Sequence, residues 1–197
     1  MSIFNIFKSK KKIPHPQKPS VEEQLRVLAD LGIKPKQDGY VEWVCYEWDR
    51  EDIETLPYNL ILYSLGGERE NAGIWERSSD DVFSFDIDCV DNENIYAKIL
   101  IRLVELSKGM LNITNIISIV DHENQTASIS FRYDEINYSW DLKFEEDLFD
   151  KMNQLLKESG SSMFFYICSF DKNLIVLFES PDTIEKVNGL VTIPFIY

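Results

Sequence analysis

The chain has 197 residues, of which 44% are hydrophobic and 27% are charged, and this composition excludes a disordered chain. The formal net charge is −14, but residues 1–20 hold five lysines and no acid, so the remaining 15 basic and 34 acidic residues give a net charge of −19. A body this acidic is expected to repel nucleic acid and to attract basic proteins.

The cellular location follows from what the sequence lacks. No apolar run approaches the roughly 18 residues that cross a bilayer, and the first residues lack the apolar region and cleavage site of a secretory signal. Cys45, Cys89 and Cys168 are scattered among apolar residues, which indicates free thiols and neither a disulfide framework nor a zinc site. We therefore expect a cytoplasmic protein without a transmembrane segment.

Residues 1–19 are predicted to form a flexible, basic, proline-rich tail. Four apolar residues at positions 3, 4, 6 and 7 precede a lysine cluster, and Pro14, Pro16 and Pro19 prevent a continuing helix. We favour a solubilising tail. The alternative is weak contact of residues 1–12 with a membrane surface, in which the apolar side chains insert and the lysines meet anionic headgroups.

The next segment begins with a well-marked helix. Ser20 and Glu23 form a capping box, apolar residues recur at helical spacing as far as Leu31, and Gly32 ends the pattern. Residues Tyr40–Trp48 are rich in β-formers and predict a strand. Pro57 fits the first turn of a helix that runs to Leu65, with a buried strand over Asn59–Leu65 as the alternative.

From Asp81 onward the expected order is strand, helix, three strands, helix, two strands and helix. The fold class is therefore α+β, with a mostly antiparallel sheet made of a meander and a C-terminal hairpin, and with helices packed on one face. Residues 20–197 are expected to form a single domain. The segments that carry this prediction are the helices over 92–107 and 145–158, the strands over 111–120, 126–133, 136–144, 163–168 and 174–178, and a short helix capped by Ser180.

The stretch "FDIDCVD" is the strongest candidate for chemistry. Asp86 and Asp88 resemble the first motif of haloacid-dehalogenase-like phosphatases and the metal-binding strand of exonuclease-like folds. However, Cys89–Val90 replaces the Gly-Thr of the phosphatase motif, and the late acidic pair is missing. The alternation of the strand instead predicts that Phe83, Phe85 and Ile87 face the core and that the acids lie on the opposite face.

No other catalytic set is evident, so we expect a protein that is not an enzyme and has no cofactor. The sequence lacks a Gly-x-Ser-x-Gly motif and a phosphate-binding glycine loop, and it contains only two histidines. A metal-dependent phosphoesterase that uses Asp86 and Asp88 remains the alternative, and its test is whether the face that carries these acids is covered.

A positive signal for protein binding comes from the segment "YVEWVCYEWDRED". It places aromatic side chains among acids, a pattern that can anchor a basic partner, although the aromatic residues can also belong to the core. The predicted partner-binding residues are Trp43, Tyr46, Trp48, Asp49, Glu51 and Asp52.

At a coarse level the chain resembles the small acidic α+β immunity proteins encoded in bacterial polymorphic-toxin loci. The segments "MSIFNIFKSKKK", "YEWDRED", "FDIDCVD" and "SWDLKFEEDLFDKMNQLLKESG" carry this resemblance. The chain also resembles an uncharacterised bacterial family built on "PYNLILYSLGGE" and "FDIDCVDNENIYAKI". The resemblance implies a non-enzymatic protein-binding module that neutralises a basic toxin, and it assigns no site residue.

Overall fold

The computed structural model describes residues 18–37, 40–71, 73–87, 94–121, 126–143 and 145–197. The predicted tail therefore lies almost entirely outside the described residues. In chain order the elements are α1 (Val21–Asp30), α2 (Tyr40–Glu47), α3 (Arg50–Thr55), α4 (Asn59–Gly66), β1 (Glu68–Asn71), β2 (Ile74–Arg77), β3 (Val82–Asp86), α5 (Ile95–Leu106), β4 (Ile113–Asp121), β5 (Thr126–Tyr133), β6 (Ile136–Leu142), α6 (Glu145–Glu158), β7 (Phe164–Phe170), β8 (Asn173–Glu179) and α7 (Pro181–Asn188). From β3 onward this order is the one predicted from the sequence.

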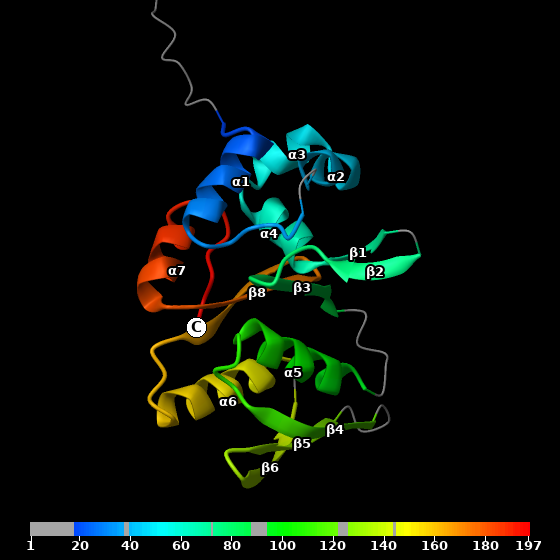
Figure 1. Cartoon of the computed structure of the whole chain (residues 1–197), viewed down its shortest axis with the longest axis vertical. Coiled ribbons are helices and arrows are strands. Elements are labelled where there is room, and N and C mark those ends of the chain that lie inside the picture. The colour runs from blue at the N-terminus through cyan, green and yellow to red at the C-terminus, as the bar shows by residue number, and fades with distance from the viewer. Residues whose placement is uncertain (1–17, 38–39, 72, 88–93, 122–125, 144) are drawn as a thin grey trace, which may run out of the picture.

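Within the described residues, three antiparallel sheets organise the fold, in the orders β1-β2, β3-β8-β7 and β4-β5-β6. Figure 1 shows the layers: α1–α4 and α7 lie on one side of the central sheet that contains β8, and α5 and α6 lie between that sheet and β4–β6. The β1–β2 hairpin projects from the side of the molecule. The predicted α+β class with antiparallel strands is confirmed.

The central sheet separates two hydrophobic cores. On β8, Leu174, Val176 and Phe178 face the lower core, which is built with α5, α6 and β4–β6, whereas Ile175 and Leu177 face the upper core, which is built with α1–α4 and α7. A strand buried on both faces is apolar at nearly every position, as β8 is. The prediction that helices pack on one face of the sheet holds for β4–β5–β6. The central sheet differs from this prediction, because helices cover both of its faces.

Helices α1 and α4 agree with their sequence signals. The Ser20 side chain accepts a hydrogen bond from the Glu23 backbone N–H at 3.2 Å, which is the predicted cap of α1. Residues Asn59–Gly66 form a helix, so the alternative strand at this position is wrong. Almost the whole of α4 is buried, which explains why its sequence shows no amphipathic period.

The strand predicted over Tyr40–Trp48 is wrong, because residues Tyr40–Glu47 form helix α2. Tyr40 and Val44 lie four residues apart, on one side of the helix, and both are buried in the upper core. Burial of this pair outweighs the weak preference of aromatic and β-branched residues for strands.

The end of α4 packs directly against the backbone of β3. A Cβ atom at Gly66 would lie 2.4 Å from the backbone N of Ser84 and 2.6 Å from the carbonyl carbon of Phe83. The Ser84 hydroxyl donates a 2.6 Å hydrogen bond to the carbonyl oxygen of Tyr63 in α4. Only a glycine permits so close an approach of helix and strand.

The outer edge of β7 is closed by side-chain and backbone groups. The Asn153 side chain of α6 bonds both the N–H and the C=O of Phe165, each at 2.8 Å. Two residues along, Ile167 exchanges backbone hydrogen bonds with Ile196 at 2.8 and 2.9 Å. These contacts satisfy an edge that would otherwise offer free groups to another strand.

Candidate functional site

The two tryptophans of the predicted partner-binding segment pack against the body. Trp43 is partly buried, with its ring centroid 5.1 Å from that of Tyr40. Trp48 donates a 3.0 Å hydrogen bond from Nε1 to the Ser64 hydroxyl and meets the Tyr63 ring edge-on at 6.1 Å. The Trp48 ring therefore links the end of α2 to α4, whereas the Trp43 ring contacts Tyr40 of its own helix.

The acids of the same segment lie on the surface. Asp49, Glu51 and Asp52 are exposed at the start of α3, while the side chain of Tyr46 lies outside what the structure describes. The structure thus separates the predicted site into aromatic rings that pack inward and carboxylates that face solvent. The role of these residues in partner binding stays a prediction.

The aspartate pair on β3 is only partly described. The predicted alternation is confirmed, since Phe83, Phe85 and Ile87 pack on the lower core and Ser84 faces α4. Asp86 is partly buried opposite Asn173 of β8, and Asp88 lies outside the described residues. Within the described ranges, no group of three or more histidine, cysteine or acidic side chains could hold a metal ion.

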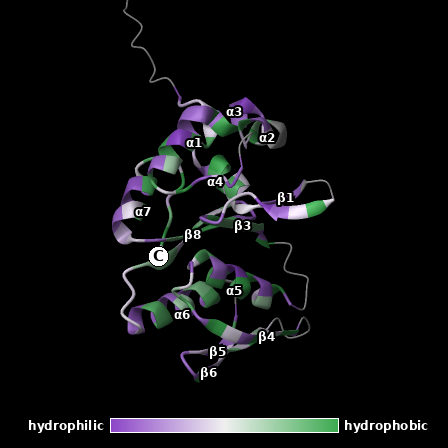
Figure 2. Ribbon diagram, in the orientation of Figure 1, coloured by the Kyte–Doolittle hydropathy of each residue, from purple (hydrophilic) through white to green (hydrophobic). Residues whose placement is uncertain are grey.

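The β1–β2 hairpin carries the most exposed aromatic side chain of the structure's described part. Ile74 is 62% exposed and Trp75 is 66% exposed, and Figure 2 shows hydrophobic colour at the projecting end of the hairpin. Glu70 lies directly opposite Trp75 in the register. Large apolar side chains this exposed on a projecting element are typical of binding surfaces.

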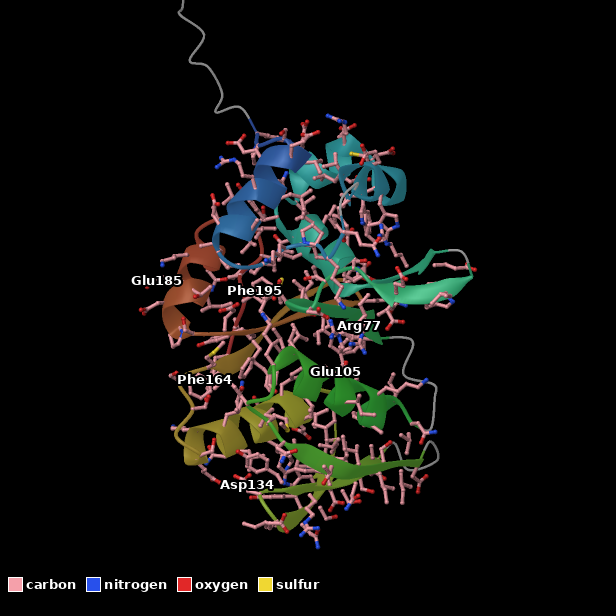
Figure 3. The ribbon with its side chains drawn as sticks, viewed as in Figure 1. Arg77, Glu105, Asp134, Phe164, Glu185 and Phe195 are labelled. Atoms are coloured by element: carbon pink, nitrogen blue, oxygen red, sulfur yellow. The ribbon has the colours of Figure 1, made fainter. Side chains whose placement is uncertain are left out.

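Long-range contacts hold the hairpin in place. The Gln37 side chain accepts a hydrogen bond from Arg69 of β1 and donates one to Glu76 of β2, the latter at 3.0 Å. On the other face, Arg77 of β2 pairs with Glu105 of α5, with its Nη2 atom 2.7–2.8 Å from both carboxylate oxygens. Figure 3 shows these two residues between the hairpin and α5.

A pocket of about 450 Å³ lies where the end of α4, the hairpin, β3 and α5 meet. The aromatic rings of Phe83 and Phe85 stack at 5.0 Å and form one wall, and Ile95, Ile99 and Ile101 of α5 form another. The remaining lining residues are Gly66, Glu68, Arg77, Ser84, Lys98, Arg102 and Glu105. The site is therefore an apolar pocket with a charged end.

Arg102 is the buried centre of that charged end. It is 7% exposed, and its Nη2 atom donates to the carbonyl oxygens of Ser79 at 3.0 Å and Val82 at 2.9 Å. Its guanidinium lies over the Phe83 ring at 5.8 Å. Burial lowers the pKa of Arg102, the charge of Arg77 lowers it further, and Glu105 opposes both effects.

Sequence reasoning missed both the hairpin and the pocket. The alternating acids and arginines of "ERENAGIWER" around Gly73, which has φ +82°, were the available signal for the hairpin. The pocket brings together residues from five elements, α4, β1, β2, β3 and α5, and has no local signal.

The chain was compared with protein-family models, with curated proteins and with solved structures, and no significant match was found. Among the helices of the described ranges, none is both long and apolar enough to cross a membrane. Any functional conclusion therefore depends on the surface and the pocket described above.

Proposed function

We propose that this chain is a non-enzymatic protein-binding module whose β1–β2 hairpin anchors a basic partner. The observation that carries the proposal is the exposure of Ile74 and Trp75 on a projecting hairpin. Tryptophan is enriched among the residues that dominate binding energy at interfaces, because its large ring buries much apolar area at low entropic cost.

The charges around Trp75 favour a basic partner. Glu70 faces Trp75 across the hairpin, so a carboxylate lies beside the ring, whereas the Glu76 side chain lies on the opposite face, where it accepts a hydrogen bond from Gln37. A lysine or arginine of the partner can then stack on the ring and pair with an acid. The exposed acids Asp49, Glu51 and Asp52 and the net charge of −19 over residues 21–197 add long-range attraction.

The proposal is tested by affinity capture from the native host with three baits. The wild-type chain is compared with a Trp75→Ala/Ile74→Ser variant and with Ile117→Ser/Ile119→Ser, a control that removes two isoleucines of similar exposure from β4. We expect a basic protein to be enriched by the wild type and the control and to be lost with the hairpin variant. The absence of any enriched protein, or equal capture by all three baits, contradicts the proposal.

The specific form that we propose is an immunity protein that neutralises a basic toxin in a reducing cytoplasm. It is supported by the acidic body and by Cys45 and Cys168, which are free thiols. The test is growth rescue: the neighbouring open reading frame is expressed with and without this chain. Rescue that depends on Trp75 supports the immunity role, whereas a non-toxic neighbour or the lack of rescue refutes it while leaving protein binding to the capture experiment.

A further inference from the structure

In the pocket between the hairpin and α5, Arg77 Nη2 bonds Glu105 closely, but a second guanidinium nitrogen of Arg77 and one of Arg102 make only long carboxylate contacts. Arg77 Nε lies 3.9 Å from Glu68, and Arg102 Nη1 lies 3.6 Å from Glu105. Charge-assisted hydrogen bonds between arginine and carboxylate are about 2.7–2.9 Å long. Within the part of the chain that the structure describes, these two nitrogens thus have donor capacity that a further anion can use.

The charge balance of the pocket is opposite to that of the protein. Its lining includes three cations, Arg77, Lys98 and Arg102, and two carboxylates, Glu68 and Glu105. Glu105 is shared by both arginines. The lining thus carries an excess of one positive charge in a chain of net charge −14, and this excess attracts an anion. The attraction is stronger because Arg102 is buried and poorly screened by water.

The rest of the pocket fits an apolar body. The stacked rings of Phe83 and Phe85 and the side chains of Ile95 and Ile99 line a volume of about 450 Å³. Pockets of roughly 300–1,000 Å³ that are mostly apolar with a few placed polar groups are typical of sites for small organic ligands. A ligand that matches both parts has one anionic end and an aliphatic or aromatic remainder.

We propose that this pocket binds a small organic monocarboxylate, with its carboxylate on Arg77 and Arg102 and its apolar body between the β3 phenylalanines and the α5 isoleucines. The planar fork of arginine suits a carboxylate, which can accept two hydrogen bonds at once. This pocket is proposed to bind an anion, whereas the Trp75 surface is proposed to bind a basic protein. The pocket proposal therefore does not depend on the proposed protein-binding function.

Decanoate is the probe that tests the proposal, with decanol as the uncharged control of the same chain length. At pH 7.5, isothermal titration below the micellar concentration is expected to show saturable one-to-one binding of decanoate and at least tenfold weaker binding of decanol. No saturable binding of decanoate, or equal binding of decanol, overturns the proposal.

Two pairs of variants locate the binding. Arg77→Met is expected to weaken the affinity for decanoate about tenfold or more. Arg132→Met breaks the ion pair with Glu135 at the distant β5–β6 turn and is expected to leave the affinity for decanoate unchanged. Ile101→Glu adds a carboxylate at an exposed position of the pocket lining and is expected to weaken decanoate binding relative to the wild type. Ile119→Glu, at an exposed position of β4, is expected to leave decanoate binding unchanged. Because Ile101 is exposed, its variant tests the pocket even if Arg77→Met fails to fold, and equal affinity within both pairs refutes the proposed site.

Discussion

The contact between α4 and β3 gives a sharp test of the fold, because two adjacent glycines differ completely in their surroundings. A Cβ at Gly66 would lie 2.4–2.6 Å from the backbone of Phe83 and Ser84, a segment that β3–β8 pairing holds in place. At Gly67 the nearest atom would be 3.7 Å away, and the backbone, with φ −81° and ψ 175°, suits any residue. Gly66→Ala and Gly67→Ala therefore form a matched pair.

The magnitude follows from the balance of two effects. Overpacking costs about 1–3 kcal/mol, and backbone-to-backbone contacts as short as those at Gly66 place the cost at the upper end. Alanine recovers at most about 1 kcal/mol of helix propensity, and less at the last residue of a helix. We expect Gly66→Ala to lower the free energy of unfolding by about 2 kcal/mol and Gly67→Ala to change it by less than about 0.5 kcal/mol.

Urea unfolding followed by circular dichroism measures this difference. The slope of free energy against urea should be the same for both variants, so that the midpoints report stability alone. In thermal unfolding, about 2 kcal/mol corresponds to a fall of roughly 4–8 °C for a domain of this size. Equal stability of the two variants would refute the close packing of α4 on β3.

Three further predictions concern buried groups. Burial raises the pKa of the Cys168 thiol to about 11. In a variant with Cys168 as its sole cysteine, Ellman's reagent should therefore react with this thiol at pH 8 only after unfolding. Rapid reaction of the thiol in the native protein would contradict its burial. Burial also raises the pKa of Glu179 above its ordinary 4.5, so its stabilising contribution is complete below about pH 4.5 and is lost as the pH rises through the folded-state pKa. The Glu179→Gln variant should therefore gain stability relative to the wild type between pH 4 and pH 7. A stability difference that does not depend on pH would refute the shift. Asn153→Ala leaves the N–H and C=O of Phe165 without their side-chain partner and should cost about 2–4 kcal/mol of unfolding free energy, whereas Asn137→Ala, at an exposed position of β6, should cost less than about 0.5 kcal/mol.

Local signals account for the parts of the fold that the sequence predicts correctly. The Ser20 side chain caps α1 through a hydrogen bond to a residue only three positions away, and the turn at Asp134–Glu135 joins neighbouring strands whose alternation marks their buried face. Each of these features is decided by residues close together in the chain. The prediction of helix α5 succeeded for the same reason, since its apolar stripe is strong over three turns.

The failures involve contacts between distant segments. Tyr40–Glu47 is helical because Tyr40 and Val44 are buried together in the upper core, among residues from other segments that no local pattern reveals. Pairing of β3 with β8 brings together Val82 and Leu177, which are far apart in the chain. Because of this pairing, β3 joins β8 and β7 in one sheet, while β4–β6 form another.

The candidate site shows the same limitation. The sequence emphasised Trp43 and Trp48, which pack inward, and overlooked Trp75, because an aromatic residue in a short strand looks the same whether it is exposed or buried. Arg77 and Glu105 lie 28 residues apart and meet only after the hairpin folds over α5. The alternation along β3 correctly predicted that Ser84 lies on the side opposite the phenylalanines. It did not predict that α4 packs over Ser84 on that side.

The most direct test of the proposed function is the dissociation constant of the captured basic partner, measured by isothermal titration with three forms of the chain. For Trp75→Ala we expect a loss of at least about 2 kcal/mol, or roughly thirty-fold in affinity, as for a dominant interface residue. For Ile117→Ser/Ile119→Ser we expect affinity within threefold of the wild type. An unchanged dissociation constant for Trp75→Ala, or an equal loss in the β4 control, would contradict a partner surface on the β1–β2 hairpin.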